Sequence, residues 1–229
     1  MKVAALLPVK GFRNAKQRLS PLLDSAAREL LAETMFRDIL QQVTFARGLE
    51  GTYVVTGDDK VAAIALDAGA EVIREPAETG ETGAVDFARR ELKRAGREAV
   101  LILPGDMPLV RAPHVEQILA QIPDASVAPF ALLVPSHDRL GTNALLLAPP
   151  DVIPLRFGYD SFTFHSLQIT RQGLALRIFE NDAIALDIDE PRDLQRFLTY
   201  QVSDGHSMQV ARALVGASAT VLKSGSGAL

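Results

Sequence analysis

The sequence predicts an α/β fold with a mostly parallel sheet between two layers of helices. Short apolar runs typical of strands alternate five times with segments of helical periodicity in the first 128 residues, a pattern that favours a parallel sheet. The first run, residues 3–9, is almost continuously apolar, which is typical of a strand buried on both faces. With 229 residues, the chain can form one large α/β domain or two small ones.

The first half of the chain contains the most regular predicted elements. Predicted strands cover residues 3–9, 51–56, 71–74, 99–103 and 125–128. Predicted helices cover residues 20–43, 60–68, 85–95 and 113–122. Ser20 and Pro21 suit the start of the first helix, because Ser can cap a helix and Pro fits its first position. Gly69 and Gly96 are expected to end the second and third helices.

The second half is less regular. We expect a turn and strand over residues 140–147, a helix over 161–171, strands over 174–179 and 183–187, and a last helix from Asp189 to about Tyr200. Residues 1–200 are expected to form a single domain. Residues 201–229 are rich in Ser, Gly and Ala, so we expect a weakly ordered tail with a weak helix over 208–215.

The loop after the first strand is strongly cationic. It carries Lys10, Arg13, Lys16 and Arg18, and the first acidic residue of the chain is Asp24, although the net charge is −4. A buried strand that runs into a cationic, Gly-containing loop can hold phosphates. On charge alone, a solvated basic surface loop explains the pattern equally well.

Three aspartates are candidates for a cation site. Asp106 directly follows a predicted buried strand, at the strand end where parallel sheets bind ligands. A turn or a helix cap is the alternative role for this residue. Asp187 and Asp189 lie two residues apart in a segment predicted to be extended, so they point to the same side. Mg²⁺ would relieve the repulsion between such carboxylates, although Asp189 also suits the cap of the last helix.

Two turn clusters, one around Thr142 and one from Gly158 to Ser161, contain small and hydroxyl side chains. Thr142 and Ser161 can supply hydroxyls to a phosphate or carboxylate, and Gly158 allows a close backbone approach. The helix expected to begin near Ser161 would add its positive end. By themselves, these are ordinary turn residues.

Several classes of protein are disfavoured by what the sequence lacks. It has no cysteine, so disulfides and thiolate sites are excluded. It also lacks a Walker phosphate loop, a G-x-G-x-x-G after the first strand and a G-x-S-x-G elbow. Four histidines lie far apart and are expected to be structural or solvated: His114, His137, His165 and His206. No apolar run reaches the length of about 18 residues that a membrane span needs. We therefore expect a cytoplasmic protein that binds neither membranes nor nucleic acid.

Five motifs occur in an order that resembles a known family. They are P-V-K-G-F-R-N-A-K-Q-R-L, L-P-G-D-M-P-L, L-G-T-N-A, F-G-Y-D-S-F and L-D-I-D-E-P. Together they resemble the 2-phospho-L-lactate and phosphoenolpyruvate guanylyltransferases of coenzyme F-420 biosynthesis, which are related to the molybdenum-cofactor nucleotidyltransferases. The resemblance covers about residues 1–200. It implies a Rossmann-like nucleotidyltransferase fold of the nucleotide-diphospho-sugar transferase type.

The resemblance also implies roles for individual residues. Mg²⁺ would be held by Asp106, Asp187 and Asp189, and the catalytic residues would be Asp106 and Lys16. GTP, the co-substrate, would be bound by Lys10, Lys16, Arg18, Gly80, Thr82 and Gly105. The phosphorylated acid would be bound by Thr142, Gly158 and Ser161. Thr82 stands where the family usually has Asn, close to the base in relatives, and this difference bears on the preference for guanine.

The implied reaction moves GMP from GTP to a phosphorylated three-carbon acid and releases pyrophosphate. The acid would be phosphoenolpyruvate, 2-phospho-L-lactate or 3-phospho-D-glycerate, with a slight preference for phosphoenolpyruvate. A phosphate monoester is ionised at neutral pH, so it needs charge neutralisation and positioning rather than a protein nucleophile. The alternatives are a nucleotidyltransferase for a sugar phosphate or the molybdenum cofactor, a non-catalytic nucleotide-binding regulator, and a purely structural domain. The second half and the tail could support a homodimer.

Overall fold

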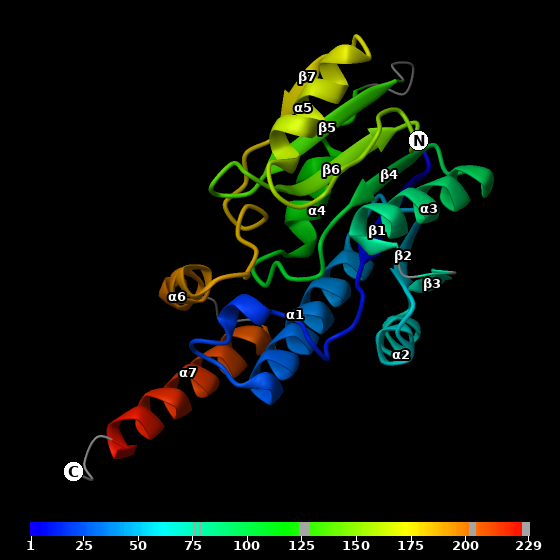
Figure 1. Cartoon of the computed structure of the whole chain (residues 1–229). Helices are drawn as coiled ribbons and strands as arrows, with labels where there is room; N and C mark the ends of the chain where they lie inside the picture. The colour runs from blue at the N-terminus through cyan, green and yellow to red at the C-terminus, as the bar shows by residue number, and fades with distance from the viewer. Residues whose placement is uncertain (76, 78, 124–128, 202–204, 226–229) are drawn as a thin grey trace.

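A seven-stranded sheet lies at the centre of the structure (Figure 1). The computed structural model describes residues 1–75, 77, 79–123, 129–201 and 205–225, and of residues 218–225 it describes the backbone only. The strands are β1 (Val3–Pro8), β2 (Gly51–Thr56), β3 (Glu71–Arg74), β4 (Ala99–Ile102), β5 (Phe130–Pro135), β6 (Thr142–Ala148) and β7 (Leu176–Ile178). Their order is β3-β2-β1-β4-β6-β5-β7. Strand β6 is antiparallel to β4 and β5, and the other pairs are parallel, which confirms the predicted mostly parallel sheet.

Helices cover both faces of this sheet. They are the short 3-10 helix η1 (Gln17–Leu19), α1 (Ser25–Phe45), α2 (Asp59–Asp67), α3 (Gly80–Arg94), α4 (Ala112–Leu119), α5 (Ser161–Arg171), α6 (Pro191–Thr199) and α7 (His206–Gly225). Side chains of α1, α2 and α4 share a buried core with Leu7 of β1, and side chains of α3 and α5 share another with Leu6. Because neighbouring residues of a strand point to opposite faces, the helices form the two outer layers of the predicted three-layer fold.

A third core joins α1, α6 and α7 at one end of the molecule. Met208 and Ala211 of α7 are buried in it, and Figure 1 shows α7 lying alongside α1. The weak helix expected over residues 208–215 is therefore part of a longer helix with a packed first half. Residues 202–204 and 226–229, which also belong to the expected tail, lie outside the described residues.

Two helices, α1 and α3, begin five residues away from their predicted starts at residues 20 and 85. Helix α1 begins at Ser25, because the Asp24 carboxylate accepts a hydrogen bond from the Ala27 N–H at 2.8 Å and caps it there. Helix α3 begins at Gly80 rather than residue 85. This earlier start places the predicted nucleotide-binding loop in the first turn of a helix.

Two strand predictions also differ from the structure. Residues 183–187 form a turn followed by an irregular segment, which pairs with no strand among the described residues. Strand β5 was not predicted, and the strand expected at residues 125–128 falls outside the described residues. By contrast, β2, β3 and α5 have the predicted bounds. Among the described residues, no helix combines the length and apolar character that a membrane span requires.

Candidate active site

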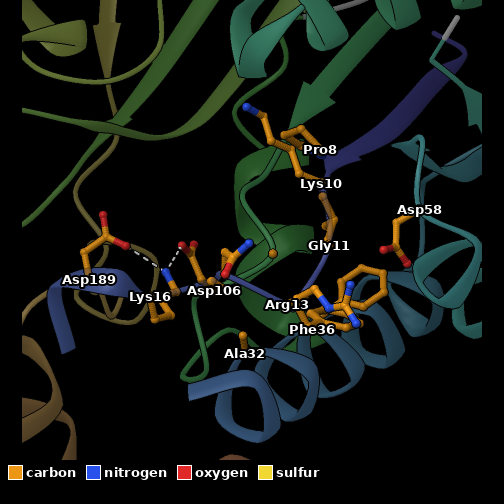
Figure 2. Close-up of a pocket in the computed structure, with 15 residues that line it drawn as sticks. Pro8, Lys10, Gly11, Arg13, Lys16, Ala32, Phe36, Asp58, Asp106 and Asp189 are labelled. Atoms are coloured by element: carbon orange, nitrogen blue, oxygen red, sulfur yellow. Dashed lines mark hydrogen bonds and ion pairs between the residues drawn. The ribbon is translucent and has the colours of Figure 1, made fainter. Parts of the chain in front are cut away.

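Two clefts open at the carboxyl ends of β1 and β4, which are parallel neighbours in the sheet. The first has a volume of about 460 Å³ and is lined mainly by the loop after β1 (Figure 2). The second, about 570 Å³, is lined by the start of β6, the start of α5 and the segment before α6. Asp106 and Asp189 line both clefts. The expected shared crevice is therefore present, and these two carboxylates stand where its two halves meet.

The first cleft has a cationic wall. Lys10, Arg13 and Lys16 line it, and the first two are exposed to solvent. Glycine allows the close packing of its loops, since a Cβ on Gly105 would lie 2.9 Å from the Val9 side chain. Gly105 thus has a packing role in addition to its place in the cleft wall.

Lys16 lies between the two shared carboxylates (Figure 2). Its Nζ is 2.5 Å from Asp106 Oδ2 and 2.7 Å from Asp189 Oδ1, and the Lys16 side chain is only 9 % exposed. Burial alone would lower the pKa of Lys16, but attraction to Asp106 and Asp189 outweighs it and raises the pKa above the usual value. Lys16 is therefore a fixed positive charge at the junction of the clefts.

Asp187 completes an acidic group with Asp106 and Asp189. Its carboxylate accepts a hydrogen bond from Asn143 Nδ2 at 3.0 Å, and the Ile188 N–H donates to the Asp106 carbonyl at 3.3 Å. Burial, and then the charge of Asp106, raise the pKa of Asp187 above its usual value. Burial would also raise the pKa of Asp189, but Lys16 lowers it overall.

This acidic group suits a cation, although it is not arranged as a ready metal cluster. Within the ranges that the structure describes, no three His, Cys, Asp or Glu side chains are grouped as metal ligands, and Lys16 Nζ lies between the carboxylates of Asp106 and Asp189. Asp106 Oδ1, however, is buried and has no hydrogen-bond partner among the described residues. A buried oxygen of this kind is costly unless a ligand or ion satisfies it, and carboxylate oxygens are the ligands that Mg²⁺ prefers.

The cap of α6 leaves Asp189 free for this role. The Asp193 carboxylate, rather than Asp189, accepts hydrogen bonds from the backbone, at 3.2 Å from the Asp189 N–H and 2.8 Å from the Glu190 N–H. Glu190 occupies the capping position of the helix. The Asp189 carboxylate consequently faces Lys16 and the clefts.

The second cleft brings together the three residues predicted to bind the acid. Thr142 begins β6 and Ser161 begins α5, and the Thr142 N–H donates to Ser161 Oγ at 3.0 Å. Gly158 has a φ of +96°, which glycine adopts without strain, and it lines the same cleft. The N-terminal end of α5 lies at this wall, where its dipole favours an anion.

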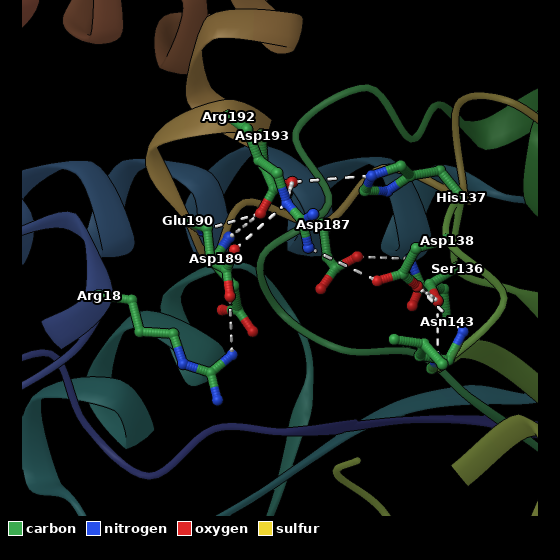
Figure 3. A network of polar contacts seen from close by, with 12 residues as sticks. Arg18, Ser136, His137, Asp138, Asn143, Asp187, Asp189, Glu190, Arg192 and Asp193 are labelled. Atoms are coloured by element: carbon green, nitrogen blue, oxygen red, sulfur yellow. Dashed lines mark hydrogen bonds and ion pairs between the residues drawn. The ribbon is translucent and has the colours of Figure 1, made fainter. Parts of the chain in front are cut away.

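The second cleft is nonetheless acidic. Arg18 and Arg192 face carboxylates contributed by several elements: Glu81, Asp106, Asp138, Asp187, Asp189, Glu190 and Asp193. Figure 3 shows the two arginines beside Asp138 and the acidic segment 187–193, and Arg18 lies 3.6 Å from Glu190. Arg18, predicted to bind the nucleotide, thus lines the second cleft and not the first. An anionic ligand here needs positive charge beyond these two side chains.

The predicted base-binding loop lies beside the second cleft. Thr82 Oγ accepts a hydrogen bond from the Phe157 N–H at 2.9 Å, so it holds the segment that carries Gly158. As far as the described residues define the walls, Gly80 and Thr82 lie outside both clefts, and their contact with the base stays a prediction. Glu81, which was not predicted, lines the second cleft. The Glu81 side chain is exposed at the cleft surface. Its partly desolvated position in the cleft, and then the negative charges of Asp106 and Asp189, raise its pKa to about 7.

His165, expected to be structural or solvated, makes a contact with Thr142 that the prediction did not include. It is fully buried, and its Nδ1 lies 3.0 Å from Thr142 Oγ. The Arg156 N–H approaches Nε2 at 3.2 Å. The spacing offered a signal, because His165 follows Ser161 by one helical turn and therefore shares its face of α5.

Comparison with known proteins identifies the family. The family described as "Guanylyl transferase CofC like" matches residues 3–220. The chain is 37 % identical to a phosphoenolpyruvate guanylyltransferase of Rubrobacter xylanophilus, over 86 % of this chain and 93 % of that protein. It is 31 % identical to a 2-phospho-L-lactate guanylyltransferase of Methanothermobacter thermautotrophicus, over 87 % and 86 %. It is 32 % identical to a 3-phospho-D-glycerate guanylyltransferase of Colwellia psychrerythraea, over 85 % and 90 %.

The fold comparison agrees with the sequence. A solved structure from Desulfovibrio desulfuricans, described as a nucleotide-diphospho-sugar transferase, has a TM-score of 0.76 at 19 % identity and covers 95 % of this chain and 99 % of its own. At that identity, the likeness concerns the fold alone. The match of the family model over nearly the whole chain, together with the curated relatives, shows that this chain belongs to the CofC-like guanylyl transferase family.

Proposed function

We propose that this protein transfers GMP from GTP to the phosphate of a phosphorylated three-carbon acid and releases pyrophosphate. The observation that carries this proposal is the meeting of two clefts at Lys16, Asp106 and Asp189. One cleft has a cationic wall suited to a triphosphate, and the other has hydroxyls and a helix N-terminus suited to a second anion. The reacting groups would meet at the junction.

The reaction joins two anions, so charge and position limit its rate. A phosphate oxygen of the acid attacks the α-phosphorus of GTP, a new P–O bond forms, and the bond to the β-phosphate breaks. The acid's phosphate is already ionised near neutral pH, since its second pKa is about 6. The attacking group therefore needs no protein base. Lys10 and Arg13 would reduce the charge on the triphosphate, and Lys16 would neutralise charge at the junction of the two ligands.

A divalent cation fits the acidic group. Asp106, Asp187 and Asp189 would hold Mg²⁺, and the unpartnered Asp106 Oδ1 supports this assignment. When bound, Mg²⁺ would offset the negative charge of phosphate oxygens from both ligands. The excess of carboxylates in the second cleft supports the same conclusion, because two arginines alone would leave an anionic acid facing net negative charge.

Phosphoenolpyruvate is the acceptor we propose. The relative at 37 % identity carries that name, whereas relatives named for the other two acids are 31 to 33 % identical. Thr142, Gly158 and Ser161 would bind the carboxylate and phosphate that all three acids share. A cytoplasmic location and a homodimer stay predictions.

The test is pyrophosphate release by the purified protein with Mg²⁺ and GTP, adding each of the three acids in turn, with ATP as the control nucleotide. We expect release with GTP and phosphoenolpyruvate and much slower release with ATP. Release only with one of the other two acids would show that this acid, and not phosphoenolpyruvate, is the acceptor. No release with any acid, despite GTP binding in a thermal-shift assay, would contradict the proposed activity.

A further inference from the structure

We propose that His165 is a positioning residue, which makes the Thr142 hydroxyl a hydrogen-bond donor toward the acceptor acid. The inference rests on the proposed function, because it takes the second cleft to be the site of that acid. It goes beyond the family resemblance, which implied roles for Thr142 and Ser161 but none for a histidine. The alternative is that His165 has a purely structural role in the core.

The hydrogen bonds of His165 define its tautomer. The Arg156 backbone N–H can only donate, so Nε2, which it approaches at 3.2 Å, must present a lone pair. In a neutral ring, the proton then lies on Nδ1. Nδ1–H therefore donates to Thr142 Oγ at 3.0 Å.

The surroundings keep the ring neutral and fixed in orientation. His165 is fully buried, and Phe157 and Phe164 pack edge-on against it at centroid distances of 5.3 and 5.7 Å. Burial, and then the charges of Arg156 and Arg89, lower the pKa of His165 to about 4. A protonated ring would also lose the lone pair that the Arg156 N–H needs.

This orientation has a consequence for the cleft. Thr142 Oγ accepts the bond from His165, so its own hydrogen remains for another acceptor. Ser161 is in the same state, because its Oγ accepts the bond from the Thr142 N–H at 3.0 Å and its hydrogen is likewise unassigned. Both residues line the second cleft. Two hydroxyl groups that can each donate a hydrogen bond, beside a helix N-terminus, form a site for a carboxylate or phosphate oxygen.

Two substitutions separate the two nitrogens of the ring. Asn is shorter than His, so in His165→Asn the side-chain amide lies near the place of Nδ1 and can still donate to Thr142. Gln is longer, so in His165→Gln it lies near the place of Nε2 and loses that donor. The exposed His206 provides a matched control, His206→Gln, on α7.

The experiment measures KM for phosphoenolpyruvate, KM for GTP, kcat and the melting temperature. For His165→Gln we expect a rise of about tenfold in KM for the acid, the usual effect of one lost hydrogen bond, with KM for GTP unchanged. His165→Asn should stay close to the parent. The Thr142→Val variant should lose acid affinity to a similar extent, and adding His165→Gln to it should cause little further loss.

An independent readout does not depend on turnover. The ¹⁵N chemical shifts of the His165 ring in the parent protein should show protonated Nδ1 and unprotonated Nε2. The opposite tautomer would overturn the inference even if His165→Gln fails to fold. If the parent is active and His165→Gln has the same KM for the acid, the role of His165 is overturned but the proposed function is not. A parent inactive with all three acids would overturn the proposed function, and this inference with it.

Discussion

Lowering the pH should destabilise the folded protein through His165. The pKa of this residue is about 4 in the folded protein, against an ordinary value of 6.5. A group whose pKa is lowered on folding contributes stability that is present above the unfolded pKa and is lost as the pH falls through the folded one. The loss should therefore develop between about pH 6.5 and pH 4.

The magnitude follows from the size of this shift. Each pKa unit corresponds to about 1.4 kcal/mol, so the change from 6.5 to about 4 amounts to about 3 kcal/mol in the free energy of unfolding. This is a large share of the usual total of about 5 to 15 kcal/mol. Glu81 and Asp187 act in the opposite sense, because their raised pKa values give stability that is lost as the pH rises.

The assay is urea unfolding of the parent and of His165→Asn from pH 7.5 to pH 4. The carboxyl groups are common to both proteins, so their effects cancel in the difference between the two curves. The parent should lose about 3 kcal/mol more than the variant over this range. Parallel pH profiles for the two proteins would refute the neutral, buried state inferred for His165.

Three further predictions concern the junction of the clefts. Asp106→Asn should lower kcat by at least about 10²-fold, whereas two opposing effects act on the melting temperature, namely loss of the ion pair to Lys16 and relief of the repulsion of Asp187; activity within tenfold of the parent would remove Asp106 from the site. Lys16→Gln should lower activity. Added Mg²⁺ should raise the melting temperature of this variant more than that of the parent, since no ammonium competes for the carboxylates. Equal rises in the two proteins would argue against Mg²⁺ and the Lys16 ammonium occupying the same position. Gly105→Ala should cost about 1 to 3 kcal/mol in urea unfolding, because its Cβ would lie 2.9 Å from the Val9 side chain. Gly57→Ala is the matched control, as its Cβ would have no neighbour within 4 Å, and an equal loss there would contradict the packing argument.

Much of the fold follows from local apolar patterns. Strands β1 and β4 are short, continuously apolar runs, and β2 has an apolar centre flanked by threonines. Such runs have few alternatives to a buried strand. The start of α3 was missed because Gly80 and Gly83 are typical of loops. Gly83 is required for a reason that appears only in three dimensions, since a Cβ there would collide with the Thr79 side chain.

The segment at residues 183–187 shows a different limit. Its apolar alternation is real, because Ile184, Leu186 and Ile188 are all buried. They contact the cores beneath the segment, however, and the backbone makes isolated hydrogen bonds to His137 and Asp106 instead of a ladder. Alternating burial therefore predicts an extended chain but not a strand partner.

Part of the candidate site follows from the predicted strands. Parallel strands end at one edge of a sheet, so the approach of the first loop to Asp106 follows from the strand assignments. The ion pairs of Lys16 and the tautomer of His165 depend on distances between residues far apart in the chain. Neither can be obtained from spacing.

The most direct test of guanylyl transfer is ³¹P NMR of the protein with GTP, phosphoenolpyruvate and Mg²⁺. If GMP is transferred to the acid, the phosphoenolpyruvate signal and the three GTP signals should decrease together. A pyrophosphate signal and a pair of mutually coupled diphosphate signals should replace them, showing that the acid's phosphate is bonded to the former α-phosphorus. Formation of GDP and inorganic phosphate, or loss of GTP without change in phosphoenolpyruvate, would contradict transfer of GMP to the acid.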